Sequence, residues 1–405
     1  MNLPYFISAR ISQQAKGSFS SIISRVAVIS IAVGVGAILL SFMILLGFQD
    51  KIKDKIYSFS GHLIISKFTL NNAYEDQVLS LSDSLAFQLD NLPNVIHWQP
   101  NAYRAGLLKT PDEVQGVVVK GFSQRQDTVS FKRHLVEGRI PDLTGPGYST
   151  EVVLSKKISR YLKLNLGDEV LIYFIQNPPR YRKLQIVGIY ETGLEEFDEN
   201  IIYGDIGMVR RINNWKSQEV GGIEIFIDDI DKIDDQMEAI FDTIDYDLYV
   251  EKVSDRYLQI FDWLSLLNRN VVIFLVLILF VAGFSMVSIL LILIMERTQM
   301  VGVLKAMGAP GKLLRDIFLA NGVRLIIKGL GWGNLLGFGM GLAQYYGRII
   351  PLDATSYYMD HVPIAFNWAA VIGVNLLVIL LISASLFIPL SVISRIQPIK
   401  SIRFD

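Results

Sequence analysis

The sequence predicts an α-helical membrane domain of four transmembrane helices, with a large inserted α+β extracytoplasmic domain. Three observations predict this fold class. Of the 405 residues, 51% are hydrophobic and only 19% are charged, a composition too apolar for a soluble chain of this length. Four stretches reach the roughly 20 apolar residues that a helix needs to cross a bilayer. One long segment between them instead shows the short alternating runs that are typical of strands.

The four predicted spans differ in how purely apolar they are. The first, second and fourth contain no charged residue. The third is rich in glycine and carries Lys328 close to its start, so its mean hydropathy is lower. Their predicted boundaries are residues 26–47, 271–295, 326–346 and 368–393.

The segments outside the spans predict the rest of the organisation. Before the first span, apolar residues close to Arg10 and Lys16 favour a short helix along the inner membrane interface, with a loosely ordered tail as the alternative. The extracytoplasmic domain follows the first span directly. The predicted segments are an N-terminal interfacial segment (1–25), the extracytoplasmic domain (48–270), a cytoplasmic helix and turn (296–325), a short outer loop (347–367) and a cytoplasmic tail (394–405).

Charge distribution predicts the orientation. The residues 1–25, 296–328 and 395–405 together hold twelve Lys or Arg against three Asp or Glu. The rest of the chain holds twenty-six against thirty-six. Basic segments beside membrane spans stay in the cytoplasm, so both termini are expected inside and the large domain outside. A net charge of −1 excludes a strongly basic nucleic-acid-binding protein.

The inserted domain combines strands and helices. Five β-branched or alternating runs predict strands, whereas residues 74–92 and 231–244 show the apolar spacing of helices. The elements do not follow strict βαβ alternation, so the domain is assigned to the α+β class. The five strand-like runs are LIIS, VQGVVVKGF, VLIYFI, LQIVGIY and IEIFID.

Sequence signals for catalysis are missing. No phosphate-binding G-x-x-x-x-G-K-[ST] loop, G-x-S-x-G elbow or H-E-x-x-H helix occurs, and the chain has no cysteine. The four histidines are scattered, and the acidic run Glu195–Glu199 is expected to be a solvated loop. The two most apolar spans hold no ionisable residue, which disfavours ion-coupled transport. We therefore expect no catalytic residue, no metal site and no cofactor bound by this chain.

The glycines of the third span predict close helix packing. Four of them are spaced by four residues, so they share one face of a helix. Small residues in this pattern let a second helix approach closely in lipid. They are Gly329, Gly333, Gly337 and Gly341.

The segment after the second span carries the strongest local pattern. A helix is expected to continue from that span into the cytoplasm, with Met300, Val303, Leu304 and Met307 on one face. The run Gly308–Gly311 then breaks this helix and turns the chain back. On pattern alone, the helix fits a partner's groove and the membrane interface equally well.

The same segment carries a family resemblance. Residues 296–309, ERTQMVGVLKAMGA, resemble the coupling-helix signature of ABC permeases of the lipoprotein-releasing, macrolide-exporting and cell-division superfamily. Blocks along nearly the whole chain resemble the LolC/LolE-like branch in the same order, including GVVVKGF and YETGLEEFDEN. One stretch departs from that branch, because residues 176–182 are short where the carrier-recruiting permease has a protruding hairpin.

The resemblance implies a permease subunit that extracts triacylated lipoproteins from the outer leaflet of the bacterial inner membrane and hands them to a periplasmic carrier. Its implied partners are a cytoplasmic ATPase homodimer that binds ATP, a second permease, identical or paralogous, and membrane lipids. Two alternatives remain: a MacB-like efflux permease for amphiphiles or peptides, and an FtsX-like, non-transporting signal transmitter to a cell-wall hydrolase.

The resemblance also implies roles for named residues. Contact with the ATPase is expected at Glu296, Arg297, Met300, Val303, Leu304, Lys305, Met307 and Gly308. A lipoprotein cavity is expected at Leu39, Phe42, Met43, Leu46, Phe274 and Leu277. A carrier-docking loop is expected at Pro178, Pro179 and Tyr181.

Overall fold

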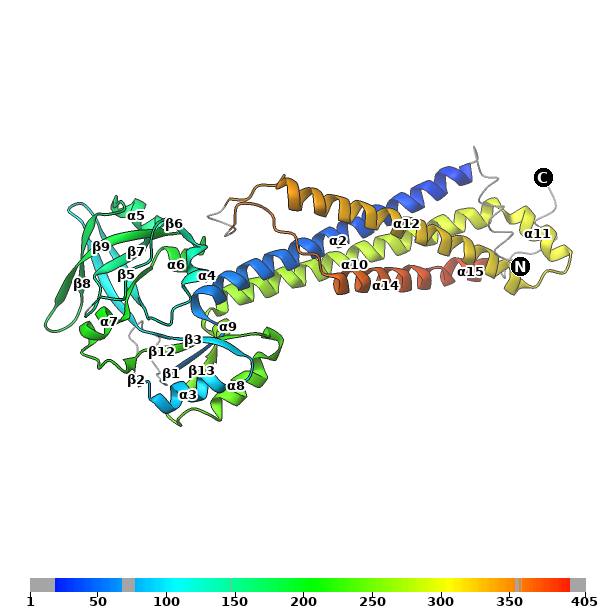
Figure 1. Cartoon of the computed structure of the whole chain (residues 1–405). Helices are drawn as coiled ribbons and strands as arrows, with labels where there is room; N and C mark the ends of the chain where they lie inside the picture. Colours follow the sequence, from blue (N-terminus) through cyan, green and yellow to red (C-terminus); the bar gives the residue numbers. More distant parts are fainter. Residues whose placement is uncertain (1–18, 68–76, 146, 354–356, 358, 394–405) are drawn as a thin grey trace. The chain divides into compact units, whose positions relative to one another are not determined.

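A computed structural model describes residues 19–67, 77–145, 147–353, 357 and 359–393 (Figure 1). The tail 394–405 and most of the expected N-terminal segment, residues 1–18, lie outside the described residues. The chain divides into two compact units. One takes its described residues from 1–50, 263–351 and 361–405, and the other from 51–262 and 352–360.

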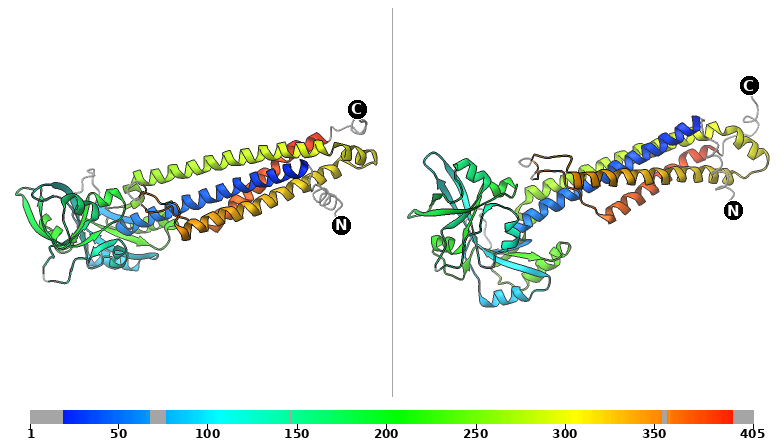
Figure 2. Two further views of the ribbon diagram at one scale, coloured as in Figure 1. Left: turned by 90° about the horizontal axis from the view of Figure 1, so that it is seen from above. Right: turned by 45° about the horizontal axis from the view of Figure 1, so that its top comes forward.

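The helical unit is a bundle of long helices that run side by side (Figure 2). Among the described residues, four helices are long and apolar enough to cross a membrane. The first three contain a whole predicted span, and the last contains most of the fourth. Their apolar side chains meet in one core, to which each helix contributes, for example through Val35, Leu290, Phe318 and Val378. The helices are α2 (Phe19–Ser60), α10 (Leu258–Glu296), α12 (Gly311–Gly347) and α14 (Trp368–Ser385).

Helix α12 begins at Gly311, before the predicted start of the third span, and α2 and α10 extend from their predicted spans into the second unit. Helix α2 continues to Ser60, because Ile52, Ile56 and Phe59 keep the spacing of a buried helical face after the apolar stretch ends. Helix α10 begins at Leu258, before the predicted start of the second span. Both helices therefore contribute residues to both units.

The helix expected to continue unbroken after the second span is interrupted, which corrects that prediction. Helix α10 ends at Glu296, and α11 (Thr298–Ala306) is a separate helix. The hydroxyl of Thr298 donates to the Met295 carbonyl at 2.6 Å, and such local side-chain bonds compete with regular helix bonds. The fourth span is likewise divided, since Pro389 has no N–H to give to the Ser385 carbonyl. A further helix, α15 (Phe387–Ile393), follows this break.

The second unit contains two larger sheets and one small one. The seven-stranded sheet has the order β6-β9-β7-β10-β5-β4-β8, and β8 also pairs with β9, so the sheet closes on itself. The four-stranded sheet has the order β13-β1-β12-β3, and β2 pairs with β11. The strands are β1 (Leu63–Lys67), β2 (Leu79–Ser80), β3 (Val95–Asn101), β4 (Tyr103–Lys109), β5 (Val114–Phe122), β6 (Leu135–Gly138), β7 (Glu151–Ser155), β8 (Glu169–Phe174), β9 (Arg180–Tyr190), β10 (Ile201–Asp205), β11 (Glu219–Val220), β12 (Gly222–Ile227) and β13 (Leu248–Lys252).

One hydrophobic core joins the two larger sheets. Ile65 and Trp98 of the four-stranded sheet belong to the same buried cluster as Val119 and Ile172 of the seven-stranded sheet. Short helices complete the unit. They are α3 (Asp83–Asn91), α4 (Thr128–Lys132), α5 (Lys156–Leu162), α6 (Glu195–Asp198), α7 (Ile206–Asn213), the 3-10 helix η1 (Ile230–Lys232), α8 (Ile233–Phe241) and α9 (Val253–Arg256).

The mixed α+β prediction for this unit is confirmed. Each of the five predicted strand runs overlaps a strand, and α8 lies within the predicted helix 231–244. The helix predicted over 74–92 is wrong at its start. Leu79 and Ser80 pair with β11, and the Ser82 side chain then caps α3 by accepting a hydrogen bond from the Leu85 amide.

Candidate functional site

The segment expected to contact an ATPase forms α11 and the turn that follows it. Val301 is buried, and Met300 and Leu304 pack against the core of the helical unit. Val303 and Met307 are 45% and 74% exposed. The expected apolar face of α11 therefore has an inward part and an outward part. Part of it stabilises the chain's own bundle, and Val303 with Met307 forms an outward ridge.

The turn after α11 depends on Gly308. Its amide donates to the Lys305 carbonyl and the Ala309 amide donates to the Leu304 carbonyl, both at 3.0 Å. Gly308 has φ +87°, a conformation that other residues rarely adopt, although a Cβ atom here would meet nothing within 4 Å. Substitution at Gly308 would therefore strain the backbone without crowding a neighbour. Of the charged residues expected here, Glu296 is exposed and Arg297 is half-buried.

The four glycines of α12 face α2. A Cβ atom built on Gly329 would lie 2.6 Å from the Ile31 Cβ atom, and one on Gly333 would lie 2.7 Å from the Val35 Cβ atom. Both distances are shorter than any ordinary carbon contact, so only glycine permits this packing. The remaining pairs continue the pattern in the same direction along both helices: Gly337 with Leu39 and Gly341 with Met43.

This packing changes the interpretation of the six expected cavity residues. Leu39 and Met43 are 1% and 2% exposed, because the glycines bring α12 directly onto them. Phe42 also packs against the bundle core. By contrast, Phe274 and Leu277 of α10 are more than half exposed. The expected set is therefore split between a helix interface and an open face of α10, and Leu46 is half-buried.

The expected docking loop is the tip of the β8–β9 hairpin. Phe174 pairs with Arg180, so residues 175–179 form the connection, and its Asn177–Pro178 peptide bond is cis. Tyr181 belongs to β9 and lies beside Tyr173 across the strands, with ring centroids 6.1 Å apart.

The most exposed large apolar side chains of this hairpin are Ile175 and Tyr181, at 73% and 64%, and Pro178 and Pro179 are exposed beside them. Arg180 holds the hairpin down. Its guanidinium donates to the carbonyls of Arg211 and Ile212 at 2.9 and 2.7 Å, and to the Asn214 side chain at 2.7 Å. The tip is therefore short and anchored, with an apolar surface.

The acidic run Glu195–Glu199 was expected to be a solvated loop, but Glu195–Asp198 form the short helix α6. Asp198 is buried, and its carboxylate accepts hydrogen bonds from the Thr192 amide and hydroxyl and from the Gly193 amide at 2.8–3.0 Å. Burial raises the pKa of Asp198, and these hydrogen bonds oppose the rise. Among the described residues, no group of three or more metal-binding side chains occurs. The acidic run thus has a structural explanation.

A buried ion pair lies where the two larger sheets meet the end of α2. Lys120 of β5 and Glu224 of β12 are 1% and 0% exposed, and the Nζ–Oε1 distance is 2.6 Å. Lys120 also donates to the Phe59 carbonyl in the last turn of α2. Gln99 and Tyr103 donate to the Glu224 carboxylate at 2.7 and 3.2 Å. One polar network therefore joins both sheets to α2 within this unit.

Comparisons with known proteins match both units of the chain to related permeases. The FtsX-like permease C-terminal family model matches residues 272–398, and the MacB-like periplasmic core domain model matches residues 24–240. The lipoprotein-releasing system transmembrane protein LolC of Neisseria meningitidis is 22% identical over 408 residues, covering 96% of each chain. LolE of Haemophilus influenzae is 22% identical over 419 residues, covering 98% of each. The chain is a LolC/LolE-like member of the MacB/FtsX permease superfamily.

A solved structure is also similar to part of this LolC/LolE-like permease. It is the periplasmic region of MacB from Actinobacillus actinomycetemcomitans. The superposed part covers 49% of the present chain and 91% of the MacB chain, with 15% identity and a TM-score of 0.36.

Sequence analysis missed the ion pair of this LolC/LolE-like permease, although a signal was present. Lys120 stands within the apolar run VQGVVVKGF, and Glu224 within IEIFID. A charged residue on the buried face of a strand requires a partner, because an unpaired buried charge is strongly unfavourable. Which partner it has depends on strands far apart in the chain, and that requires the fold.

Proposed function

We propose that this permease is a subunit of an ABC transporter that extracts triacylated lipoproteins from the outer leaflet of the inner membrane and delivers them to a periplasmic carrier. A cytoplasmic ATPase homodimer would hydrolyse ATP, and a second permease, identical or paralogous, would complete the membrane part. Similarity to LolC and LolE proteins over nearly the whole chain supports this proposal.

The observation that carries the proposal is the continuity of helix α10. It belongs to the bundle at one end and to the α/β unit at the other, and only Arg297 separates it from α11. Movement of an ATPase bound at Val303 and Met307 would thus be transmitted to α10, a helix that reaches the outer domain. Cargo taken from the outer leaflet needs no route across the bilayer. The charge distribution supports an orientation with both termini in the cytoplasm.

The acyl chains of the lipoprotein would lie against the open face of α10. Phe274 and Leu277 are exposed there, and a second permease would close this face into a cavity. Leu39 and Met43 would support the cavity indirectly by fixing α2 against α12. Photo-crosslinkers at Phe274 that capture phospholipid but never lipoprotein would contradict this assignment.

The carrier would contact the β8–β9 hairpin through Ile175 and Tyr181. These exposed apolar groups stand on a connection that Arg180 anchors. Replacing both with serine, while keeping Arg180, should lower lipoprotein release to added carrier and leave ATP hydrolysis unchanged. Normal release would exclude this hairpin as the docking site.

Depletion of the permease tests the whole proposal. We expect lipoproteins to accumulate in the inner membrane, measured by separating inner and outer membranes and quantifying lipoproteins in each. Wild-type protein supplied from a plasmid should restore the distribution. The match to the MacB-like model favours efflux as the second candidate. An unchanged lipoprotein distribution together with increased sensitivity to amphiphilic compounds would support efflux instead.

A further inference from the structure

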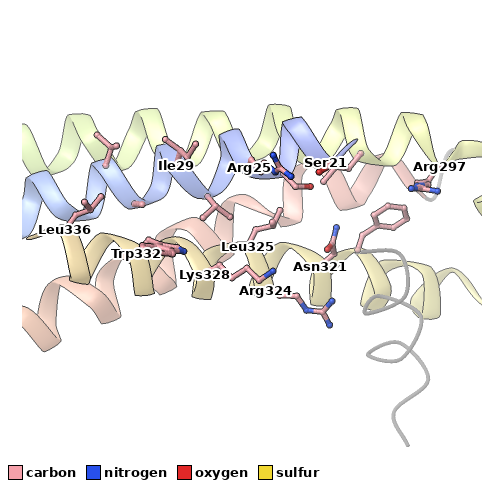
Figure 3. A pocket seen from close by; sticks show the side chains of 16 residues that line it. Ser21, Arg25, Ile29, Arg297, Asn321, Arg324, Leu325, Lys328, Trp332 and Leu336 are labelled. Atoms are coloured by element: carbon pink, nitrogen blue, oxygen red, sulfur yellow. The ribbon is translucent and has the colours of Figure 1, made fainter. Parts of the chain in front are cut away.

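A pocket of about 500 Å³ lies in the helical unit between α2 and α12 (Figure 3). Four cationic side chains line it, and none of its described lining residues is Asp or Glu. The cations are Arg25, Arg297, Arg324 and Lys328. The lining includes none of Val303, Met307, Phe274 and Leu277, the residues of the proposed ATPase and lipoprotein contacts.

The cationic side chains of the lining are concentrated at one end, where apolar side chains such as Leu325 also occur. Figure 3 shows the cations and Asn321 toward one end and Trp332 and Leu336 toward the other. On α2, the lining passes from Arg25 through Ile29 to Val33. Residues four apart lie on one helix face, so this series covers about 12 Å along the axis. The pocket therefore combines an anion-binding end with an apolar groove.

The cationic end also contains an unsatisfied donor. The Nε atom of Arg297 is buried and has no hydrogen-bond partner among the described residues. The positive charge of Arg297 adds to the attraction of this end for an anion. Trp332 lies at the start of the apolar end, about one helical turn after Lys328, and tryptophan is typical of the boundary between lipid headgroups and acyl chains. Together, these features match a molecule with an anionic head and a hydrocarbon tail.

We propose that this pocket binds one anionic phospholipid from the leaflet that meets the Arg25 end of the bundle. The headgroup phosphate would lie between Arg25 and Lys328, and one acyl chain would follow Ile29 and Val33. In the proposed orientation this is the inner leaflet, opposite to the leaflet that supplies the lipoprotein. The lipid would thus be a bound component of the permease and not its cargo.

Charge-matched double variants test the site. Arg25→Gln/Lys328→Gln removes one Arg and one Lys from the pocket, whereas Lys312→Gln/Arg315→Gln removes the same charges from exposed positions of α12 outside the lining. Thermal stabilisation of the full chain would be titrated with dioctanoyl phosphatidylglycerol, dioctanoyl phosphatidylcholine and inorganic phosphate. We expect the pocket variant alone to lose about ten-fold in apparent affinity for phosphatidylglycerol. Equal loss in both variants, or equal stabilisation by phosphatidylcholine or inorganic phosphate, would overturn the proposal.

A photo-crosslinker at Trp332 provides a second test that does not require the double variant to fold. In membranes that contain phosphatidylglycerol, we expect a lipid adduct on the full chain, detected by mass spectrometry. Adducts formed instead with residues 1–18 of the same chain, or with the second permease, would show that protein fills the pocket and would overturn the proposal.

Discussion

Glu224 is the one carboxylate in strand β12, whose other residues are glycine, isoleucine and phenylalanine. Its ion-pair partner is Lys120. Removing one member of a buried pair leaves the other charge uncompensated, which typically costs about 3–5 kcal/mol. We expect Lys120→Met to destabilise the full chain by about this amount, measured by thermal unfolding of the purified protein.

The double variant Lys120→Met/Glu224→Leu provides the control for that prediction. Replacing both charges with apolar groups removes the need for a partner, so the double variant should be more stable than Lys120→Met alone. Gln99 and Tyr103 would lose their acceptor, so full recovery is not expected. A single variant as stable as the wild type would mean that the pair contributes nothing to stability.

His62 links stability to pH. Its Nδ1 atom accepts a hydrogen bond from the Ile227 amide at 3.1 Å, and burial lowers the pKa of His62 from 6.5 to about 4. Between these two values the unfolded chain binds a proton that the folded chain excludes. The free energy of unfolding should therefore decrease as the pH falls from 7 to 5, by about 1 kcal/mol for this partly exposed group.

The variant His62→Gln should reduce this pH dependence, because glutamine can accept the same hydrogen bond and does not titrate. His134, whose pKa is also lowered to about 4 by burial, should retain its own contribution. Thermal unfolding at pH 7, 6 and 5 measures both effects. If His62→Gln has the same slope as the wild type, the pH dependence originates elsewhere.

At the scale of elements, the outward ridge of α11, formed by Val303 and Met307, is the surface to change in a test of ATPase binding. Met307→Asp would place a charge in the proposed ATPase groove, at a cost of several kcal/mol, whereas Met307→Leu keeps the apolar contact. Since 1.4 kcal/mol corresponds to ten-fold, we expect at least a ten-fold loss of co-purified ATPase for Met307→Asp only. Retained association would indicate that α11 lies on the membrane interface.

Leu304 is a less suitable position than Met307 for a test of ATPase binding. The apolar pattern alone makes Leu304→Asp an attractive variant, but Leu304 packs against the bundle of its own chain. Loss of ATPase binding in that variant would follow from a damaged bundle as readily as from a damaged interface. Met307 avoids this ambiguity because its side chain is mostly exposed.

Two glycines of α12 should respond in opposite directions. A Cβ atom at Gly333 would lie 2.7 Å from the Val35 Cβ atom, whereas one at Gly331 would meet nothing within 4 Å. We expect Gly333→Ala to destabilise the bundle by about 1–3 kcal/mol through overpacking. Gly331→Ala should be neutral or stabilising by up to about 1 kcal/mol, because alanine favours a helix. Unfolding in mixed micelles with increasing dodecyl sulfate measures both, and similar shifts would refute the packing role.

Sequence analysis located best the elements whose surroundings set one strict condition on the type of residue. A bilayer demands long apolar helices, so the first three spans were predicted within single observed helices, and the fourth covers α14 and α15. The ends at Ser60 and Leu258 were not predicted, because beyond the apolar stretch the pattern becomes amphipathic and hydropathy no longer marks it. Strand β2 was missed because two residues are too few to show a period.

The residues expected to form the site were harder to place. Hydropathy identifies Leu39 and Met43 as apolar but does not say whether lipid, cargo or another helix covers them. Their burial follows from glycines about 300 positions away in the sequence, which only the fold brings into contact. The spacing of those glycines did indicate that some helix would approach closely, without identifying α2.

At the scale of the whole molecule, the orientation can be tested with single cysteines, since the chain has none of its own. Ser84 and Ser217 are exposed positions of the α/β unit, and Ala306 is exposed on α11. Cysteines at Ser84 and Ser217 should react with a membrane-impermeant maleimide in intact spheroplasts. A cysteine at Ala306 should react only after lysis, and the reverse pattern would invert the proposed topology.

The closure of the seven-stranded sheet limits how other polypeptides can bind to it. Strand β8 is paired on one side with β4 and on the other with β9, and the one outer strand, β6, has only four residues. Within the described residues, the free edges of this sheet include only short runs, such as β6 and residues 180–184 of β9, which pair with β8 on one side only. An extended segment of a carrier or lipoprotein would find a longer outer strand in the four-stranded sheet, where β3 has seven residues. Over most of the seven-stranded sheet, recognition therefore relies on side chains, and edge-to-edge association of copies of the permease is limited to these short runs.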